Sequence, residues 1–310
     1  QARAGETGAA ARFCYDGVIF RYQPSTGDLT RPREFRQAGI ESFAASDPAK
    51  AEAEIVALTV EAVRAAGLRA FKLRLGDLGL INALLDAIEM PDRWRRRLRH
   101  HFWRPDAFRR ELARLARPAE ASKAIPKSLL DALDPNSPAE AEPVIARHLE
   151  AKGLAVAGSR TVSELAERLL DISADARAKP LPARSSELLD AFLGIAAPAR
   201  KATGALRTLL ERHGLDLGSA LDVFDRRLDL IAEEGVDIAG AEFSAGFGRS
   251  FEYYSGFVFE VAAPALGDAT PIGGGGRYDG LMQAIGSKRK VPAVGAAIHT
   301  ERLLLAVRGG

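Results

Sequence analysis

The 310-residue sequence is poor in several features that define whole classes of protein. Cys14 is the one cysteine, which excludes a disulfide framework within the chain and a multi-thiolate zinc site, and fits a reducing compartment. The five histidines show no metal-ligand spacing, and no apolar run reaches the roughly 18 residues that a membrane-spanning helix needs. The net charge of +2 gives no global sign of a nucleic-acid partner. We therefore expect a cytoplasmic protein without a metal site, a membrane segment or bound nucleic acid.

The hydrophobic pattern that is present changes character along the chain. Residues near both ends alternate between apolar and polar types and are rich in aromatic and β-branched residues, as in strands. Residues 92–239 instead repeat with helical spacing and are predicted to form a mostly helical insertion. The sequence therefore predicts an α+β fold, in which residues 1–91 and 240–310 together form an antiparallel sheet flanked by helices. The chain starts at Gln1 rather than Met, which leaves open whether a further segment precedes it.

Two polar side chains lie on the second predicted strand, residues 33–42, which pairs with residues 12–23 across a loop rich in turn formers. Gln37 and Glu41 are an even number of positions apart, so they share one face of that strand. An amide and a carboxylate on that face could bind an ammonium group. Spacing alone is equally compatible with a solvated sheet face.

A run of four glycines, Gly273 to Gly276, leads into Arg277, Tyr278 and Asp279. The run lacks the Lys-Ser/Thr pair and the glycine spacing of phosphate-binding loops. Glycine allows the backbone to approach a ligand or a neighbouring strand closely, and it is also common at strand ends. Composition alone favours a structural turn over the floor of a pocket.

The segment GRSFEYYSGFVFEV places Arg249 a few residues before the adjacent tyrosines Tyr253 and Tyr254. A tyrosine hydroxyl beside an arginine could orient a small polar molecule. An ordinary aromatic core explains the same pattern and is the more frequent case.

A basic run, RWRRRLRHHFWR at residues 93–104, resembles a nucleic-acid patch at first sight. Helical spacing places Trp94, Leu98 and Phe102 on one stripe, with the arginines around it. The pattern therefore favours a helix with one buried face and a solvated or partner-facing basic surface.

Four segments, in this order along the chain, resemble the motifs of class II histidyl-tRNA synthetases. Residues 13–42 resemble the motif 2 hairpin, residues 248–261 and 273–282 resemble the two histidine-binding motifs, and residues 294–307 resemble motif 3. The resemblance implies the antiparallel sheet of that class and a histidine pocket with the glycines as its floor. The family's histidine-binding residues correspond to Gln37, Glu41, Arg249, Tyr253, Tyr254 and Tyr278, and its nucleotide-side arginines to Arg21 and Arg302.

Departures from the synthetase pattern concern the nucleotide side and the C-terminal end. Gln23 stands where the family has a glutamate that helps to hold ATP. His299 replaces a glycine against which the nucleotide packs, so its ring should crowd the adenine site. The anticodon-binding domain that follows motif 3 in the synthetases is not part of the sequence.

This combination is similar to the regulatory subunits of ATP phosphoribosyltransferase, which are paralogues of the synthetases, and the long insertion is typical of their α-proteobacterial members. The resemblance implies a subunit without catalytic residues or a cofactor, which forms a homodimer within a hetero-octamer. Such a subunit activates the short-form catalytic subunit and mediates feedback inhibition by free histidine in the first step of histidine biosynthesis. A catalytic core fragment of a histidyl-tRNA synthetase, or an amino-acid sensor acting on another partner, are the alternatives.

Overall fold

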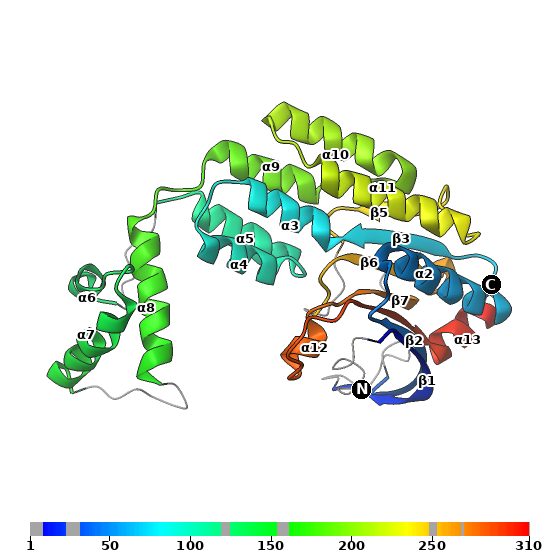
Figure 1. The fold of residues 1–310 in the computed structure, drawn as a ribbon, viewed down its shortest axis with the longest axis horizontal. Coiled ribbons are helices and arrows are strands. Elements are labelled where there is room, and N and C mark those ends of the chain that lie inside the picture. Colours follow the sequence, from blue (N-terminus) through cyan, green and yellow to red (C-terminus); the bar gives the residue numbers. More distant parts are fainter. Residues whose placement is uncertain are drawn as a thin grey trace. The chain divides into compact units, whose positions relative to one another are not determined.

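The structure is a computed structural model that describes residues 9–22, 32–118, 125–153, 161–247, 253–267 and 270–309. The chain divides into two compact units, whose helices and strands are labelled in Figure 1. Unit 1 comprises residues 1–89 and 188–310, and unit 2 comprises residues 90–187. Among the described helices, none is long and apolar enough to cross a membrane.

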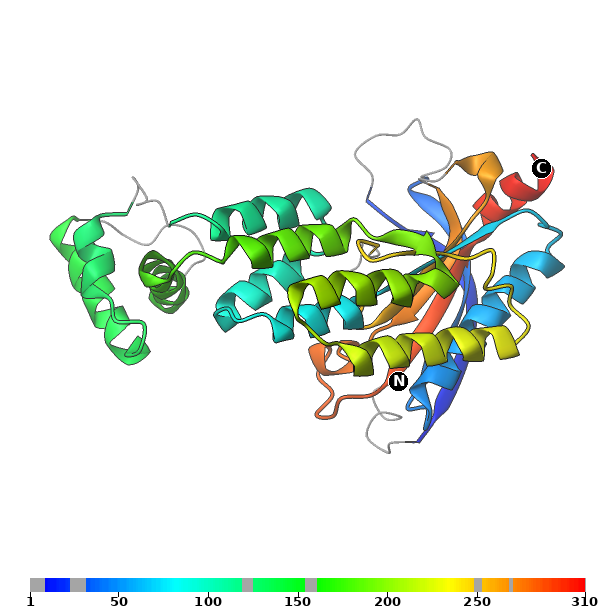
Figure 2. The ribbon, with the colours of Figure 1, turned by 90° about the horizontal axis from the view of Figure 1, so that it is seen from above.

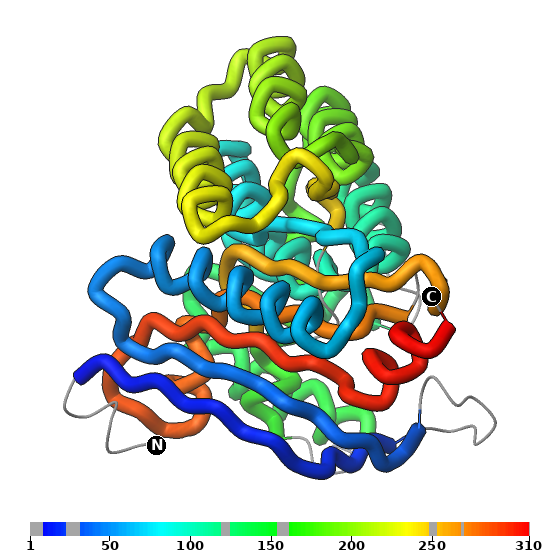
Figure 3. The backbone as a smooth tube through the Cα atoms, turned by 90° about the vertical axis from the view of Figure 1, so that its right-hand side faces the viewer, coloured from blue at the N-terminus to red at the C-terminus, as the bar shows by residue number. Residues whose placement is uncertain are grey.

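In unit 1 the described residues form an eight-stranded sheet in the order β1-β2-β8-β7-β6-β3-β5-β4. All ladders are antiparallel except the one between β3 and β5, which is parallel. Strands from the two ends of the chain lie side by side in its middle, as predicted, because β2 pairs with β8 (Figure 3). The strands are β1 Ala11–Phe20, β2 Glu34–Phe43, β3 Lys72–Asp77, β4 Ala196–Pro198, β5 Glu242–Ser244, β6 Phe257–Ala262, β7 Pro271–Arg277 and β8 Ala293–His299.

The glycine run forms the middle of strand β7, so the prediction of a turn from its composition is wrong. The physical reason is the close approach of the neighbouring strands. A Cβ atom at Gly275 would overlap the carbonyl oxygen of Gly295 on β8, and one at Gly276 would overlap that of Phe257 on β6. Only glycine fits between such close backbones.

Helices cover one face of the sheet in unit 1. Helix α2, Pro48–Ala65, begins at Asp47, whose carboxylate accepts from the first-turn amides, and packs against β2, β6, β7 and β8. Helices α10, Ala199–His213, and α11, Gly218–Glu233, lie side by side (Figure 2). The other helices of unit 1 are α3 Leu78–Ala87, α12 Leu281–Ala284, α13 Thr300–Arg308 and the 3₁₀ turn Pro264–Leu266. Helix α9, Ala183–Leu193, contains the division between the units after residue 187.

The core of unit 1 lies between this helical layer and the sheet. Phe224 of α11 packs edge-on against Phe243 of β5, with ring centroids 4.9 Å apart, and both rings are fully buried. Residues paired across the strands share a face. The face away from Phe243 therefore carries Gln37, Glu41 and Glu260, and we call it the site face.

Unit 2 is helical and contains α4 Asp92–His101, α5 Pro105–Leu115, α6 Lys127–Ala132, α7 Pro138–Ala151 and α8 Val162–Arg177. The predicted stripe of Trp94, Leu98 and Phe102 is buried. Several arginines of the basic run point inward as well. Arg93 and Arg97 of α4 pair with Asp175 of α8 at 2.7 and 2.6 Å.

The two compact units divide the helical segment predicted for residues 92–239. Residues 90–187 form unit 2, whereas residues 188–239 belong with the sheet. The physical reason is that α10 and α11 bury their apolar faces within unit 1, as the contact between Phe224 and Phe243 shows. Helical periodicity marks these residues as helices but does not show which core they cover.

Candidate functional site

The site face of strand β2 brings together the two polar residues predicted from spacing. Gln37 and Glu41 flank Gly39, and the ring of Tyr15 on β1 lies directly over Gly39, where a Cβ atom would meet it. The Gln37 amide donates a hydrogen bond to the Tyr15 hydroxyl at 2.5 Å. The bare backbone of Gly39 thus leaves room for a phenol between the amide and the carboxylate.

Glu41 and Tyr278 form a direct pair on this face. The Tyr278 hydroxyl donates a hydrogen bond to Oε2 of Glu41. Burial raises the pKa of the Glu41 carboxyl above its usual value, although the bond from Tyr278 opposes that shift. Burial and the neighbouring Glu41 raise the pKa of Tyr278 far above its ordinary value, so its phenol remains a donor. Among the described residues none forms an ion pair with Glu41, and a half-buried carboxylate of this kind is suited to an ammonium ligand.

Glu41 reaches this position because strand β8 has a glycine opposite it. Glu41 pairs with Gly295, and a Cβ atom there would overlap the Oε2 atom of Glu41. The glycine therefore provides the space into which the carboxylate turns.

Aromatic rings surround the Tyr278 phenol. Tyr253 meets Tyr278 edge-on, with centroids 5.6 Å apart, and contacts Tyr254 at 4.6 Å. Phe43 at the end of β2 packs against Tyr278 from another side at 6.1 Å. Tyr254 and Tyr278 are buried, whereas 39% of Tyr253 is exposed. The structure thus brings the three predicted tyrosines together beside Glu41.

The residues matched to the nucleotide side form a second group on the same face. The His299 imidazole stacks on Phe35 with centroids 4.2 Å apart and ring planes at 9°. The Arg21 guanidinium lies 5.1 Å from the centre of the Phe35 ring. Arg302 donates to the carbonyl oxygen of Pro271 at 2.9 Å. Arg21, Phe35 and His299 therefore form one layered stack.

The charge of His299 follows from this environment. Burial, together with the positive charges of Arg302 and Arg21, lowers the pKa of His299 to about 4, while Glu301 opposes the shift. The ring is therefore neutral at neutral pH, and its contact with Glu301, 3.3 Å from Nδ1 to Oε2, is not an ion pair there.

Residues missed by the sequence analysis complete both groups, namely Tyr15, Phe35 and Phe43. Tyr15 lies on the predicted hairpin, and only the pairing of Tyr15 with Gly39 places it beside Gln37. Two predicted residues cannot be placed, because Arg249 and Gln23 lie outside the described residues. In the part of the chain that the structure describes, no group of three His, Cys, Asp or Glu side chains could hold a metal ion.

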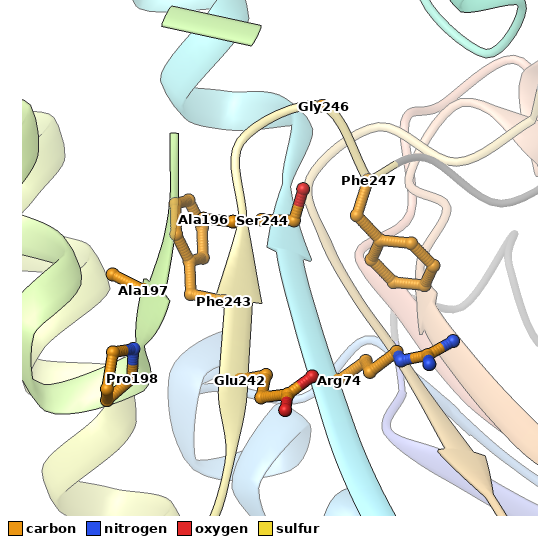
Figure 4. A pocket seen from close by; sticks show the side chains of 9 residues that line it. All are labelled: Arg74, Ala196, Ala197, Pro198, Glu242, Phe243, Ser244, Gly246 and Phe247. Atoms are coloured by element: carbon orange, nitrogen blue, oxygen red, sulfur yellow. The ribbon is translucent and has the colours of Figure 1, made fainter. Parts of the chain in front are cut away.

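A separate cavity of about 680 Å³ lies at the far end of the sheet, beside the short strands β4 and β5 (Figure 4). Arg74, Glu242, Ser244 and Phe247 contribute side chains to its wall. Arg74 is held by Glu260 of β6 at 3.1 Å. Of the residues that were assigned from the sequence and that the structure describes, none lines this cavity.

Comparison with known proteins places the chain in a family. The family model described as Histidyl-tRNA synthetase matches residues 2–174 and 165–303. The ATP phosphoribosyltransferase regulatory subunit of Brucella anthropi is 33% identical over 301 residues, which are 96% of this chain and 77% of that protein. That of Rhizobium rhizogenes is 34% identical over 300 residues, which cover 96% of this chain and 78% of that protein. The chain belongs to the family of ATP phosphoribosyltransferase regulatory subunits.

Solved structures confirm the predicted fold class. A Bacillus halodurans structure titled as an ATP phosphoribosyltransferase regulatory subunit/histidyl-tRNA synthetase matches with a TM-score of 0.62 and 21% identity, covering 100% of this chain and 63% of that one. Histidyl-tRNA synthetase from Nostoc matches with a TM-score of 0.55 and 15% identity, over 94% of this chain and 53% of that one. The α+β fold of this regulatory-subunit family is thus the synthetase-like one.

Proposed function

We propose that this chain is a non-catalytic regulatory subunit that binds free histidine on the site face and transmits its presence to the short-form catalytic subunit of ATP phosphoribosyltransferase. The relatives' names support the choice of partner, and the chemistry of the site supports the choice of effector. The observation that carries the proposal is the contact between Tyr278 and Glu41, since it combines an anionic oxygen with an aromatic enclosure. A free amino acid with a ring side chain needs the anionic oxygen for its ammonium group and the aromatic enclosure for its ring.

The ligand's chemistry assigns a role to each residue. Glu41 and Gln37 receive the α-ammonium group, which needs acceptors when it leaves water. Tyr254 and Tyr278 contact the imidazole, and Tyr253 covers it from the more exposed side. Arg249 is assigned to the carboxylate by its place in the family's motif.

The nucleotide side is proposed to be vestigial. His299 stacks on Phe35, and so takes the surface on which an adenine ring would pack in a synthetase. Arg21 and Arg302 remain beside that stack. Arg21 lies over the Phe35 ring, and Arg302 donates to the carbonyl oxygen of Pro271. We therefore assign no catalytic residue to this chain, and the chemistry of ATP and phosphoribosyl pyrophosphate belongs to the partner.

Regulation follows from linkage between the two binding events. Histidine inhibits only if it binds the active and inactive assemblies with different affinities, and the catalytic subunit must then change histidine affinity by the same factor. A coupling of about 1–3 kcal/mol is typical of such systems. We propose a homodimer of this chain within a hetero-octamer, acting in the cytoplasm.

The test is to mix this chain with a short-form ATP phosphoribosyltransferase catalytic subunit and to record the rate before and after adding histidine. A rate that rises on mixing and falls with histidine is the expected result. A rate that is insensitive to the chain, with both proteins folded and from one organism, contradicts the proposal.

The alternative is the catalytic core of a histidyl-tRNA synthetase. The description of the matching family model and the presence of both Arg21 and Arg302 beside the nucleotide side favour it. Histidine-dependent exchange of pyrophosphate into ATP would support this alternative, because only an enzyme that forms the adenylate catalyses it.

A further inference from the structure

A buried ion network lies behind the end of strand β7, on the helix-covered side of the sheet. Its centre is Glu52 of α2, whose side chain is 1% exposed and accepts from two arginines. Arg227 of α11 donates to Oε2 at 2.5 Å, and Arg277 of β7 donates to Oε1 at 2.6 Å. Arg227 also pairs with Asp77, which caps α3. One carboxylate thus connects α2, α11 and the last residue of β7.

The guanidinium of Arg277 is held on three sides. Besides the bond from Nε to Glu52, Nη1 donates to Asp279 at 3.0 Å and Nη2 donates to the carbonyl oxygen of Pro48 at 2.8 Å. A planar guanidinium with a fixed partner at each nitrogen has both its position and its orientation determined.

Tyr278 follows Arg277 directly, and their side chains leave the backbone toward opposite sides of the sheet. Arg277 reaches α2, whereas the Tyr278 hydroxyl reaches Glu41 on the site face. The backbone between them is also tied down, because the Tyr278 amide donates to the Ala293 carbonyl at 2.8 Å. Asp279 accepts in turn from the Ala293 amide at 3.0 Å.

We infer that Glu52 is a positioning residue for the ligand site. It touches neither Glu41 nor the tyrosines, but it holds Arg277, and Arg277 fixes the backbone that presents the Tyr278 phenol to Glu41. Arg227 supplies a positive charge beside Glu52, in a place where a lone carboxylate would be costly. That the presented ligand is histidine rests on the proposed function, whereas the positioning of Tyr278 does not.

The first experiment titrates histidine into the chain by calorimetry, for the parent and for Glu52→Gln. The amide removes one charge and offers an N–H toward an arginine, so one of the three contacts that hold Arg277 is weakened. Histidine affinity should fall at least tenfold. In a Tyr278→Phe background the same substitution should change affinity less than twofold, because the phenol it positions is gone. Equal losses in both backgrounds would indicate general destabilisation and overturn the inference.

A matched control uses the exposed pair between the same two helices. Arg226, next to Arg227 in α11, binds Asp47 at 2.8 Å and is 58% exposed in its side chain. Arg226→Ala should leave histidine affinity unchanged. If Glu52→Gln does not fold, Arg277→Lys serves instead, because an ammonium group cannot hold all three partners of the fork and should cause the same tenfold loss.

Hydrogen exchange of the unliganded chain separates this inference from the proposed function. Glu52→Gln should speed exchange of the Tyr278 amide, whereas Arg226→Ala should not. A parent chain that binds no histidine would overturn the proposed function, and the exchange result alone would then decide the role of Glu52. Unchanged exchange at Tyr278 in Glu52→Gln would contradict the positioning role.

Discussion

The imidazole of His299 lies almost parallel to the phenyl ring of Phe35, with 4.2 Å between the ring centroids. The two residues are far apart in sequence and meet because Gln37, two residues after Phe35, pairs with His299 across strands β2 and β8. Under the proposed function, the imidazole thus occupies the ring face on which a nucleotide base would pack in a synthetase.

Removal of this imidazole should uncover that surface. His299→Gly should lower the free energy of unfolding by about 2–3 kcal/mol, since a buried ring is lost and Phe35 remains unpacked. The same change should strengthen ATP binding relative to the parent, measured by calorimetry on folded protein. His299→Phe is the control, because it retains a stacked ring and should leave ATP binding as weak as in the parent.

Acid should destabilise unit 1 through the same residue. The unfolded imidazole takes up a proton below about pH 6.5, whereas the folded one does so only below about pH 4. The unfolded state therefore binds more protons between these values, and the free energy of unfolding falls as the pH decreases from 6.5 to 4. We expect a loss of about 1–3 kcal/mol, moderated by the exposed part of the ring. Urea unfolding at pH 7 and pH 5 should show a smaller difference in His299→Gln than in the parent.

Gly295 should be intolerant of any side chain. A methyl group there would overlap the Oε2 atom of Glu41, so Gly295→Ala must displace the carboxylate and break its bond with Tyr278. Histidine binding should weaken at least tenfold, as measured by calorimetry. Gly17→Ala on the hairpin is the control, since a Cβ atom there has no neighbour within 4 Å. Equal affinity in Gly295→Ala and the parent would remove Glu41 from the ligand site.

Unit 2 should depend on Asp175. Burial raises the pKa of this carboxyl, but hydrogen bonds from Arg93 and Trp94 and the charge of Arg97 outweigh it, so its pKa lies below the usual value. Asp175→Asn leaves these arginines without their shared carboxylate and should cost about 3–5 kcal/mol. Circular dichroism on heating should show an earlier helical transition in this variant. Arg168→Ala on the exposed side of α8 should leave that transition in place.

The sequence predicted the parts of the fold that depend on local pattern. Alternation identified the hairpin, whose strands β1 and β2 pair along their whole length. The glycine run was predicted to form a turn because composition alone cannot distinguish a turn from a strand whose neighbouring strands approach closely. The assignment of α10 and α11 to a core depends on Phe224 meeting Phe243, a long-range contact without local signal.

The sequence predicted those residues of the candidate site that belong to the family's motifs. Gln37 and Glu41 share a face by strand periodicity, and the resemblance added Tyr253, Tyr254 and Tyr278. Tyr15 and Phe35 were missed because their positions depend on strand registers. The role of Glu52 was also missed, since a buried carboxylate in the middle of a helix has no sequence signal without its arginine partners.

The central claim is that histidine acts through Glu41 of this chain, and feedback inhibition of the reconstituted complex tests it most directly. The complex with Glu41→Ala should still show the activated rate, because the carboxylate lies inside the proposed ligand site, but histidine should no longer lower that rate. Tyr15→Phe, which removes only the hydroxyl that Gln37 contacts, should remain inhibited with at most a modest loss of sensitivity. Full inhibition of the Glu41→Ala complex at the parent's histidine concentrations would contradict the account.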